Sequence, residues 1–209
     1  GGKQYKSEVA TFRTAVNSET PYAFAVISDT QGNPTVSSQI SQLAWEQRPS
    51  FVLHSGDLVS TGGNQNHWLE HFFPGMRPLI NHVPFYPVLG NHEQNANHYY
   101  NYVSLPAPEY YYTFIYGNCQ FFMIDTNQKV APGSEQYEWL KTSLSESDAQ
   151  WKFVCHHHPP YSSDENDYGN LWKTNQGTHG DLRARQLVPL YEEFGVDIVW
   201  NGHIHSYER

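Results

Sequence analysis

Charged residues are scarce in this chain of 209 residues, at 16% of the total, and basic residues are the scarcer kind. Twelve Lys and Arg stand against 21 Asp and Glu, which gives a formal net charge of -9. An acidic surface repels phosphate backbones and anionic headgroups. The composition therefore argues against a nucleic-acid partner and against a role at a membrane surface.

Long apolar runs and cysteines are also few. No run approaches the roughly 20 apolar residues that span a bilayer, and the start Gly1-Gly2-Lys3 lacks a signal-peptide pattern. Cys119 and Cys155 lie in separate apolar runs, which fits two buried thiols or one disulfide equally well. Little Lys with abundant Asn, Gln, Ser and Thr suggests a secreted, extracellular or periplasmic protein from which any leader has been removed.

The length suits one α/β domain with a sizeable core. Five apolar runs bounded by turn residues predict buried strands, at 22–28, 51–55, 85–89, 151–155 and 196–200. Helices are expected over 37–47, capped by Ser37 or Ser38, over 67–80 with an interruption at Pro74-Gly75, over 134–144 and over 181–194. Two further strands flanking Gly117-Asn118 predict a hairpin that starts a second sheet.

Two segments lie outside this pattern. Residues 5–16 alternate like a single edge strand, which is either the remnant of a preceding β domain or an added edge strand. Residues 162–180 are polar and rich in Gly, and are long enough to form a functional loop over a site.

Twelve histidines is a high number, and several come directly after the predicted strands. The five strand ends carry, in order, Asp29, Gly56-Asp57, Gly90-Asn91-His92-Glu93, His157 and Gly202-His203-Ile204-His205. Parallel strands place their carboxyl ends at one edge of a sheet, where ligands bind. Asp57 has two carboxylate oxygens and could bridge two cations. Asp29 and Asp57 could instead simply cap the helices that follow them.

Taken together and in this order, these motifs resemble the calcineurin-like metallophosphoesterase superfamily, most closely its purple-acid-phosphatase-like branch. The resemblance covers Pro21 to Arg209, and the ending Ser206-Tyr207-Glu208-Arg209 is similar to that branch in particular. It implies a four-layer α/β/β/α sandwich over residues 18–209, continuing beyond Arg209. It also implies that residues 1–17 are the remnant strand and linker of a preceding β-sandwich (fibronectin-III-like) domain.

The resemblance also implies a binuclear metal centre. One ion would be held by Asp29, Asp57 and His205, and the other by Asp57, Asn91, His157 and His203. Two divalent or trivalent transition-metal ions, with Fe, Mn and Zn all open, would clamp a phosphoryl group and make a hydroxide near neutral pH. The expected reaction is hydrolysis of a small-molecule phosphate monoester, with inversion at phosphorus and no covalent enzyme intermediate.

Further residues are expected around the metals. His92 would bind a phosphate oxygen or protonate the leaving alkoxide, with Glu93 or another acceptor orienting its ring. Asn91, His158 and His179 are further substrate-binding candidates, with His156 as the alternative to its neighbour at position 158.

Two departures from the family pattern affect the metals. Ser60 stands where the purple enzymes carry a tyrosine, so the coloured ferric-tyrosinate ligand is not expected. Gln31 stands where other members place a histidine, and it is either an additional oxygen ligand or no ligand. Two alternatives follow, a phosphodiesterase or nucleotidase on the same site, and a non-catalytic module that binds a metal or another ligand.

Overall fold

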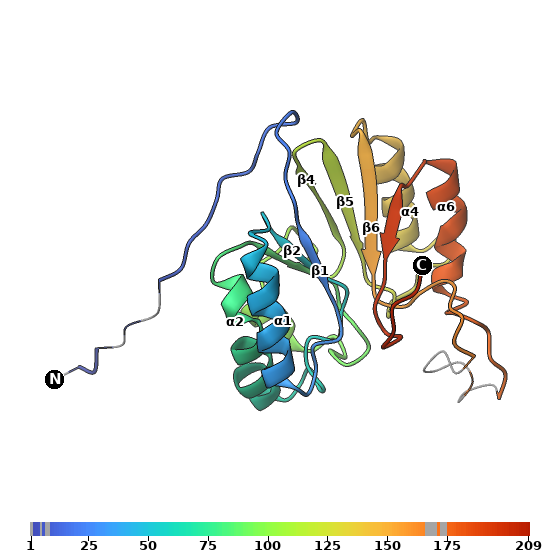
Figure 1. Ribbon diagram of the computed structural model, residues 1–209. Coiled ribbons are helices and arrows are strands. Elements are labelled where there is room, and N and C mark those ends of the chain that lie inside the picture. Colours follow the sequence, from blue (N-terminus) through green and yellow to red (C-terminus); the bar gives the residue numbers. More distant parts are fainter. Residues whose placement is uncertain (1, 5, 7–8, 166–170, 172–174) are drawn as a thin grey trace.

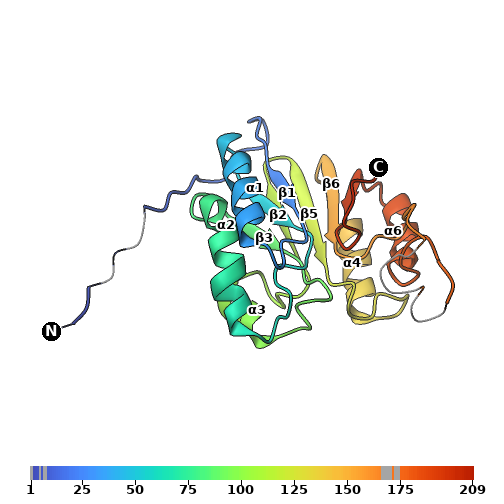
Figure 2. The ribbon, with the colours of Figure 1, turned by 60° about the horizontal axis from the view of Figure 1, so that its bottom comes forward.

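The computed structural model describes the chain except for residues 1, 5, 7–8, 166–170 and 172–174. Two β-sheets lie face to face at its centre, and helices cover the outer face of each sheet (Figure 1 and Figure 2). The first sheet has the strand order β1-β2-β3 and the second has the order β4-β5-β6-β7. The α/β/β/α sandwich predicted for the chain is confirmed.

The strands are β1 (Ala25–Ile27), β2 (Val52–His54), β3 (Phe85–Pro87), β4 (Tyr112–Tyr116), β5 (Cys119–Ile124), β6 (Trp151–His156) and β7 (Ile198–Trp200). All neighbouring pairs are parallel except the hairpin of β4 and β5. The helical elements are α1 (Pro34–Glu46), the π-helical turn η1 (His67–Phe72), α2 (Phe73–Ile80), α3 (Asn97–Tyr102), α4 (Glu135–Ser145), the 3-10 turn η2 (Ala184–Leu187) and α6 (Val188–Glu193).

Alternation along the strands builds the four layers, because successive side chains of a strand point to opposite faces. In β2, Val52 packs in the cluster under α1 and α2, whereas Leu53 packs between the two sheets. In β5, Phe121 packs between the sheets, whereas Phe122 packs against α4 and α6. All four side chains are almost completely buried, and each contributes about 1.5–3 kcal/mol to folding.

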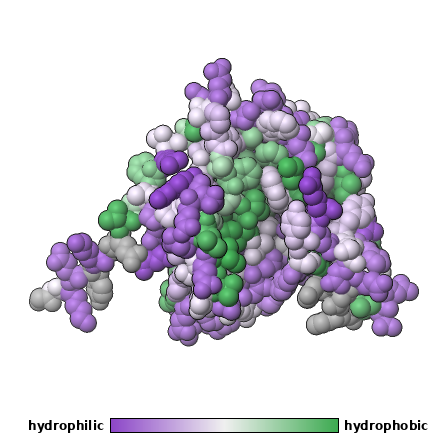
Figure 3. All heavy atoms as spheres, viewed as in Figure 1, coloured by the Kyte–Doolittle hydropathy of each residue, from purple (hydrophilic) through white to green (hydrophobic). Residues whose placement is uncertain are grey.

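The apolar layer between the sheets reaches the surface at one edge. Figure 3 shows apolar residues gathered in the middle of the face on which β1 lies, with polar residues around them. Phe24 beside β1 makes an edge-to-face contact with Trp200 of β7, with 5.3 Å between the ring centroids. This contact joins the first sheet to the last strand of the second one.

Three predicted helices differ from the observed ones. Helix α1 begins three residues earlier than expected, because Pro34 occupies its first turn and the Asn33 side chain accepts the Val36 N–H at 3.2 Å. The interruption expected at Pro74-Gly75 is absent, since α2 runs through both residues and the irregular π-helical turn precedes it. The helix expected over 181–194 is divided into η2 and α6.

Of the two interpretations of the N-terminal segment, the added edge strand is not observed among the residues that the structure describes. Among the described part of residues 1–17 there is no strand, and the segment runs as extended coil. The Thr11 N–H donates to the Asn81 carbonyl at 3.0 Å, while Phe12 is 82% exposed. An isolated strand has no ladder partner to hold it. The assignment of this segment to a preceding domain stays a prediction.

Two further expectations concern the cysteines and the membrane. Cys119 and Cys155 are buried free thiols, so the disulfide alternative is wrong. In the described part of the chain, no helix combines the length and the apolar character needed to cross a membrane.

Candidate metal centre

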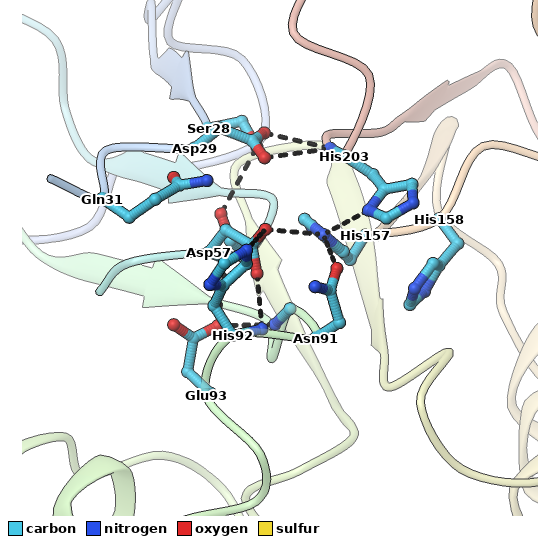
Figure 4. Close-up of polar contacts among 12 residues, drawn as sticks. Ser28, Asp29, Gln31, Asp57, Asn91, His92, Glu93, His157, His158 and His203 are labelled. Carbon is cyan, nitrogen blue, oxygen red and sulfur yellow. Dashed lines mark hydrogen bonds and ion pairs between the residues drawn. The ribbon is translucent and has the colours of Figure 1, made fainter. Parts of the chain in front are cut away.

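Polar side chains from both sheets meet at the carboxyl ends of the parallel strands (Figure 4). They are Asp29 after β1, Asp57 after β2, Asn91 after β3, His157 after β6, and His203 and His205 after β7. The structure thus brings together the six residues that the sequence motifs single out as ligands. All six lie in the loop segments that follow these strands.

Unusual backbone geometry occurs in these loop segments. Asp29, Asp57 and His203 have φ angles of 53°, 56° and 72°, in the left-handed region that few non-glycine residues adopt. A Cβ on Gly90 would lie 2.2 Å from a carboxylate oxygen of Asp57, so only glycine allows this close approach. Strained backbone of this kind clusters at functional sites.

His157 is the centre of the arrangement and is fully buried. Its Nε2 atom lies 3.2 Å from Asp57 Oδ2, 3.0 Å from Asn91 Oδ1 and 3.2 Å from His203 Nδ1. Donor atoms of Asp29, Asp57 and His157 all lie within 4.8 Å of one another.

The protonation state of the His157 ring indicates which kind of ligand these donor atoms can bind. Its Nδ1 atom lies 2.8 Å from the Ser55 carbonyl oxygen, which can only accept, so Nδ1 carries a proton. In the neutral ring, Nε2 then presents a lone pair to the oxygens of Asp57 and Asn91. Lone pairs that face one another at about 3 Å need a cation or a shared proton between them. Carboxylate, amide oxygen and imidazole are ligands that Fe, Mn and Zn accept, so the residues fit a metal centre.

A second group of contacts surrounds Asp29. His205 Nε2 lies 3.4 Å from Asp29 Oδ1, and Gln31 Nε2 lies 3.3 Å from His205 Nε2. The Asp29 carboxylate also accepts the backbone N–H of His203 at 3.0 Å and the hydroxyl of Ser28. Gln31 Oε1 is buried and has no partner in the described part of the chain. Gln31 therefore lies beside the centre, with an oxygen available to a ligand.

Charge and burial shift the pKa values at the centre. Burial lowers the pKa of His157, but the hydrogen bond to Asp57 and its negative charge overcome that effect and raise the pKa to about 9. Burial raises the pKa of Asp57, yet its contacts with His157 and His92 hold that pKa below its ordinary value. For Asp29, burial dominates and the pKa is raised. A cluster of shifted pKa values of this kind is typical of functional sites.

His92 lies beside Asp57 with its side chain 40% exposed. Its backbone N–H donates to Asp57 Oδ1 at 2.9 Å, and its Nε2 atom lies 3.9 Å from Asp57 Oδ2. Its Nδ1 atom donates to the Ser60 carbonyl at 2.8 Å, which fixes the ring. The acceptor that orients His92 is therefore the backbone of Ser60.

Of the two alternatives expected for orienting His92, Glu93 or another acceptor, the structure shows the second. Glu93 is completely buried, and its two carboxylate oxygens accept four backbone N–H groups of neighbouring loops. Burial raises the pKa of Glu93 to about 7, against the lowering effect of these hydrogen bonds. Its place beneath the loops makes it a structural support for the centre.

The two other substrate-binding candidates differ in position. His158 is 5% exposed, and its ring lies next to those of His157 and His203. Burial and the neighbouring charges hold the pKa of His158 well below its ordinary value. His179 lies on the exposed loop, and in the described part of the chain no hydrogen bond or ion pair joins its side chain to the centre.

Sequence reasoning missed one supporting segment, the turn Asp125–Asn127 that follows β5. The Asn127 side chain donates to the carbonyls of Leu89 at 3.1 Å and Gly90 at 3.2 Å, directly before Asn91. Thr126 contacts His158. The sequence could have indicated this role, because the polar turn follows a predicted strand, as the candidate ligands do.

A four-layer sandwich with carboxylate, amide and imidazole donors on its strand ends is the arrangement of a metal-dependent phosphoesterase. The family model described as "Calcineurin-like phosphoesterase" matches residues 22–207, and the chain belongs to this family.

Individual relatives agree with that assignment. "Probable inactive purple acid phosphatase 27" of Arabidopsis thaliana is 26% identical over 184 residues, covering 76% of this chain and 29% of the relative. "Nucleotide pyrophosphatase/phosphodiesterase" of Hordeum vulgare is also 26% identical, covering 76% of this chain and 48% of the relative. The purple acid phosphatase PPD1 of yellow lupin shares the fold, with a TM-score of 0.74 at 19% identity, over 91% of this chain and 39% of that protein. The chain spans less than half the length of each.

Proposed function

We propose that the chain hydrolyses phosphate monoesters with two transition-metal ions bound at the strand ends. The observation that carries this proposal is the contact of His157 Nε2 with the oxygens of Asp57 and Asn91, at 3.2 Å and 3.0 Å. In the neutral ring, these buried facing lone pairs cost free energy unless a cation or a shared proton joins them, and carboxylate, amide and imidazole together suit a transition metal. The family membership supports the same chemistry.

Each ligand has a place in this proposal. Asp29, Asp57 and His205 would hold one ion, and Asp57, Asn91, His157 and His203 would hold the other. Gln31 would add an oxygen to the first set. Bound together, two such ions supply an activated water near neutral pH and neutralise the charge of the phosphoryl group. The mixed nitrogen and oxygen donors suit Fe, Mn or Zn, and Ser60 in place of a tyrosine leaves no tyrosinate ligand at that position.

His92 is the proposed general acid. Because Ser60 holds its Nδ1 proton, the Nε2 atom is the one directed toward the bridging carboxylate of Asp57. A protonated Nε2 at this place would donate to a phosphate oxygen or to the leaving alkoxide. The partial exposure of the side chain leaves room for a substrate. Asn91, which precedes it, would face the same group.

Two alternatives share the site. The name of the barley relative favours diester or pyrophosphate substrates, which would use the same donor set. The word "inactive" in the name of the Arabidopsis relative supports a module that binds without catalysis. Retention of His92 beside the donor set favours catalysis here. His158 and His179 are proposed as substrate contacts, with the first of them supported by its burial at the centre.

The proposed substrate is a small phosphate ester, and the proposed location is outside the cytoplasm. The scarcity of charged residues and the abundance of uncharged polar ones support secretion. The net charge of -9 disfavours a nucleic-acid scaffold as the partner.

The test compares hydrolysis of p-nitrophenyl phosphate and bis(p-nitrophenyl) phosphate before and after EDTA, with add-back of Mn, Fe and Zn. We expect faster turnover of the monoester, its loss on chelation, and its return with one of these metals. Preference for the diester would establish the phosphodiesterase alternative. Absence of turnover with every metal would favour the binding module.

A further inference from the structure

His158 is a histidine that the proposed ligand set leaves out, yet it lies against the centre. One of its ring nitrogens lies within 4.8 Å of the ligand nitrogens of His157 and His203. The ring centroids are 5.0 Å and 4.6 Å from those of the same two residues (Figure 4). Such a cluster has two interpretations. His158 is either a third imidazole ligand or a group that contacts the substrate.

Thr126 distinguishes between these interpretations. It lies on the turn after β5 and is completely buried. Its Oγ1 atom accepts the backbone N–H of His158 at 3.2 Å and lies 2.8 Å from His158 Nδ1. In the described part of the chain, these are the two partners of the hydroxyl group.

The hydroxyl proton decides which ring nitrogen of His158 carries hydrogen. If Nδ1 carried it, Oγ1 would accept two hydrogen bonds and its own proton would be buried without an acceptor, which costs about 1–3 kcal/mol. If Nδ1 is unprotonated, the hydroxyl donates to it and every group is satisfied. The ring proton then lies on Nε2, and an N–H group cannot coordinate a metal.

We infer that His158 Nε2–H donates a hydrogen bond to a nonbridging oxygen of a phosphoryl group bound at the centre, and that Thr126 is the residue that sets this tautomer. The inference rests on the proposed function for the identity of the ligand. A hydrogen bond from a fixed N–H to a phosphate oxygen is charge-assisted and short.

The turn that carries Thr126 is held firmly. Gln136 of α4 donates to the Asp125 carbonyl at 2.9 Å and accepts the Asp125 N–H at 2.7 Å. Asn127 on the other side is bound to the carbonyls before Asn91. The hydroxyl of Thr126 is thus fixed relative to the metal-binding loops, as a residue that orients a substrate contact must be.

The first experiment needs no variant. In the metal-loaded protein with uniform ¹⁵N labelling, long-range ¹H–¹⁵N spectra report which nitrogen of His158 carries the proton, with His158→Gln used to assign the signals. We expect protonated Nε2 and unprotonated Nδ1, with a shift of the Nε2 signal on addition of inorganic phosphate. A protonated Nδ1 would overturn the inference.

The second experiment compares Thr126→Val, which removes the hydroxyl, with Thr126→Ser, which retains it. Thr113→Val is the matched control, because the Thr113 hydroxyl donates to the Phe121 carbonyl in the β4–β5 hairpin and has no contact with the centre in the described residues. We expect Thr126→Val to weaken binding of inorganic phosphate and to raise KM roughly tenfold, with kcat less affected. Thr126→Ser and Thr113→Val should bind phosphate like the unmodified protein.

The metal content of the His158→Gln variant distinguishes a metal ligand from a substrate contact. Loss of a metal equivalent in His158→Gln would identify His158 as a ligand and overturn the inference. Equal phosphate affinity in Thr126→Val and Thr113→Val would overturn it as well. If the unmodified protein binds two metals without turnover, the hydrolase proposal fails, while phosphate binding and the tautomer still decide the role of His158.

Discussion

Glu93 Oε2 accepts the backbone N–H of Asp57 at 2.9 Å, so a buried carboxylate supports the proposed bridging ligand from beneath. The same side chain accepts the N–H groups of Leu58 at 2.8 Å, Val59 at 3.2 Å and Gly90 at 2.7 Å. These four donors belong to the loops after β2 and β3. Glu93 therefore joins the two loops that carry Asp57 and Asn91, although it contributes no ligand atom itself.

Replacement of Glu93 by Gln should loosen both loops. The amide keeps one acceptor oxygen and turns an NH2 group toward backbone donors, so buried N–H groups lose their partner at a cost of about 2–4 kcal/mol. We expect a lower free energy of unfolding in urea and a lower metal content. Glu138→Gln is the control, since Glu138 accepts only the exposed Gly133 N–H in the described residues. Unchanged stability and metal content in Glu93→Gln would contradict this role.

His92→Ala tests the proposed general acid. The variant should bind its full complement of metal, because His92 is not in the ligand set, and should lower kcat by about 10²–10⁴-fold. His98→Ala serves as the control, since His98 stacks on Tyr102 and the described residues show no contact between it and the centre. Elemental analysis and initial rates give the result. Loss of metal in His92→Ala would mean that the residue is a ligand instead.

The two aspartates should differ in their effect on metal content. Asp57 is the proposed bridge, so Asp57→Asn should reduce occupancy at both positions. Asp29→Asn should remove one ion and leave the one held by Asn91, His157 and His203. Elemental analysis of both variants under identical loading checks the difference. Equal loss in the two variants would contradict the assignment of Asp57 as the shared ligand.

Asp125 should make stability depend on pH. Burial raises its pKa to about 6, from an ordinary value near 3.8. Between these values the folded protein binds more protons than the unfolded chain, so the free energy of unfolding falls as pH rises through this range. About two pH units correspond to at most about 3 kcal/mol.

The Asp125→Asn variant provides the measurement. Urea unfolding from pH 4 to pH 7 should show the free energy of the unmodified protein declining relative to the variant up to about pH 6 and then levelling off. Parallel curves for the two proteins over the whole range would show that Asp125 is ionised in the folded state at low pH.

The strand ends could be predicted because two local signals agree there. Val52 and Leu53 belong to an apolar run that stops at Gly56-Asp57. In a parallel sheet, ligands bind beyond the carboxyl ends of such strands. The carboxyl ends of the five runs, three in one sheet and two in the other, lie on the same side of the molecule, so the candidate ligands converge (Figure 4). Nothing in this prediction depends on the exact path of the loops.

The predictions failed where the role of a residue depends on hydrogen-bond partners that are distant in the sequence. Glu93 follows His92 directly, but its side chain is determined by the N–H groups of a loop more than 30 residues earlier. The acceptor for His92 is the backbone carbonyl of Ser60, and a backbone acceptor cannot be predicted from the pattern of side chains in the sequence. Residues 5–16 have strand-like alternation, but a strand forms only where a neighbouring edge is available.

The decisive measurement for a binuclear hydrolase is the metal content of the purified chain, determined by elemental analysis with phosphomonoester turnover followed on the same sample. We expect two equivalents of Fe, Mn or Zn per chain, and we expect a chelator to remove both the metal and the turnover. Fewer than two equivalents and no turnover, after reconstitution with each metal, would contradict the binuclear hydrolase and favour a binding module.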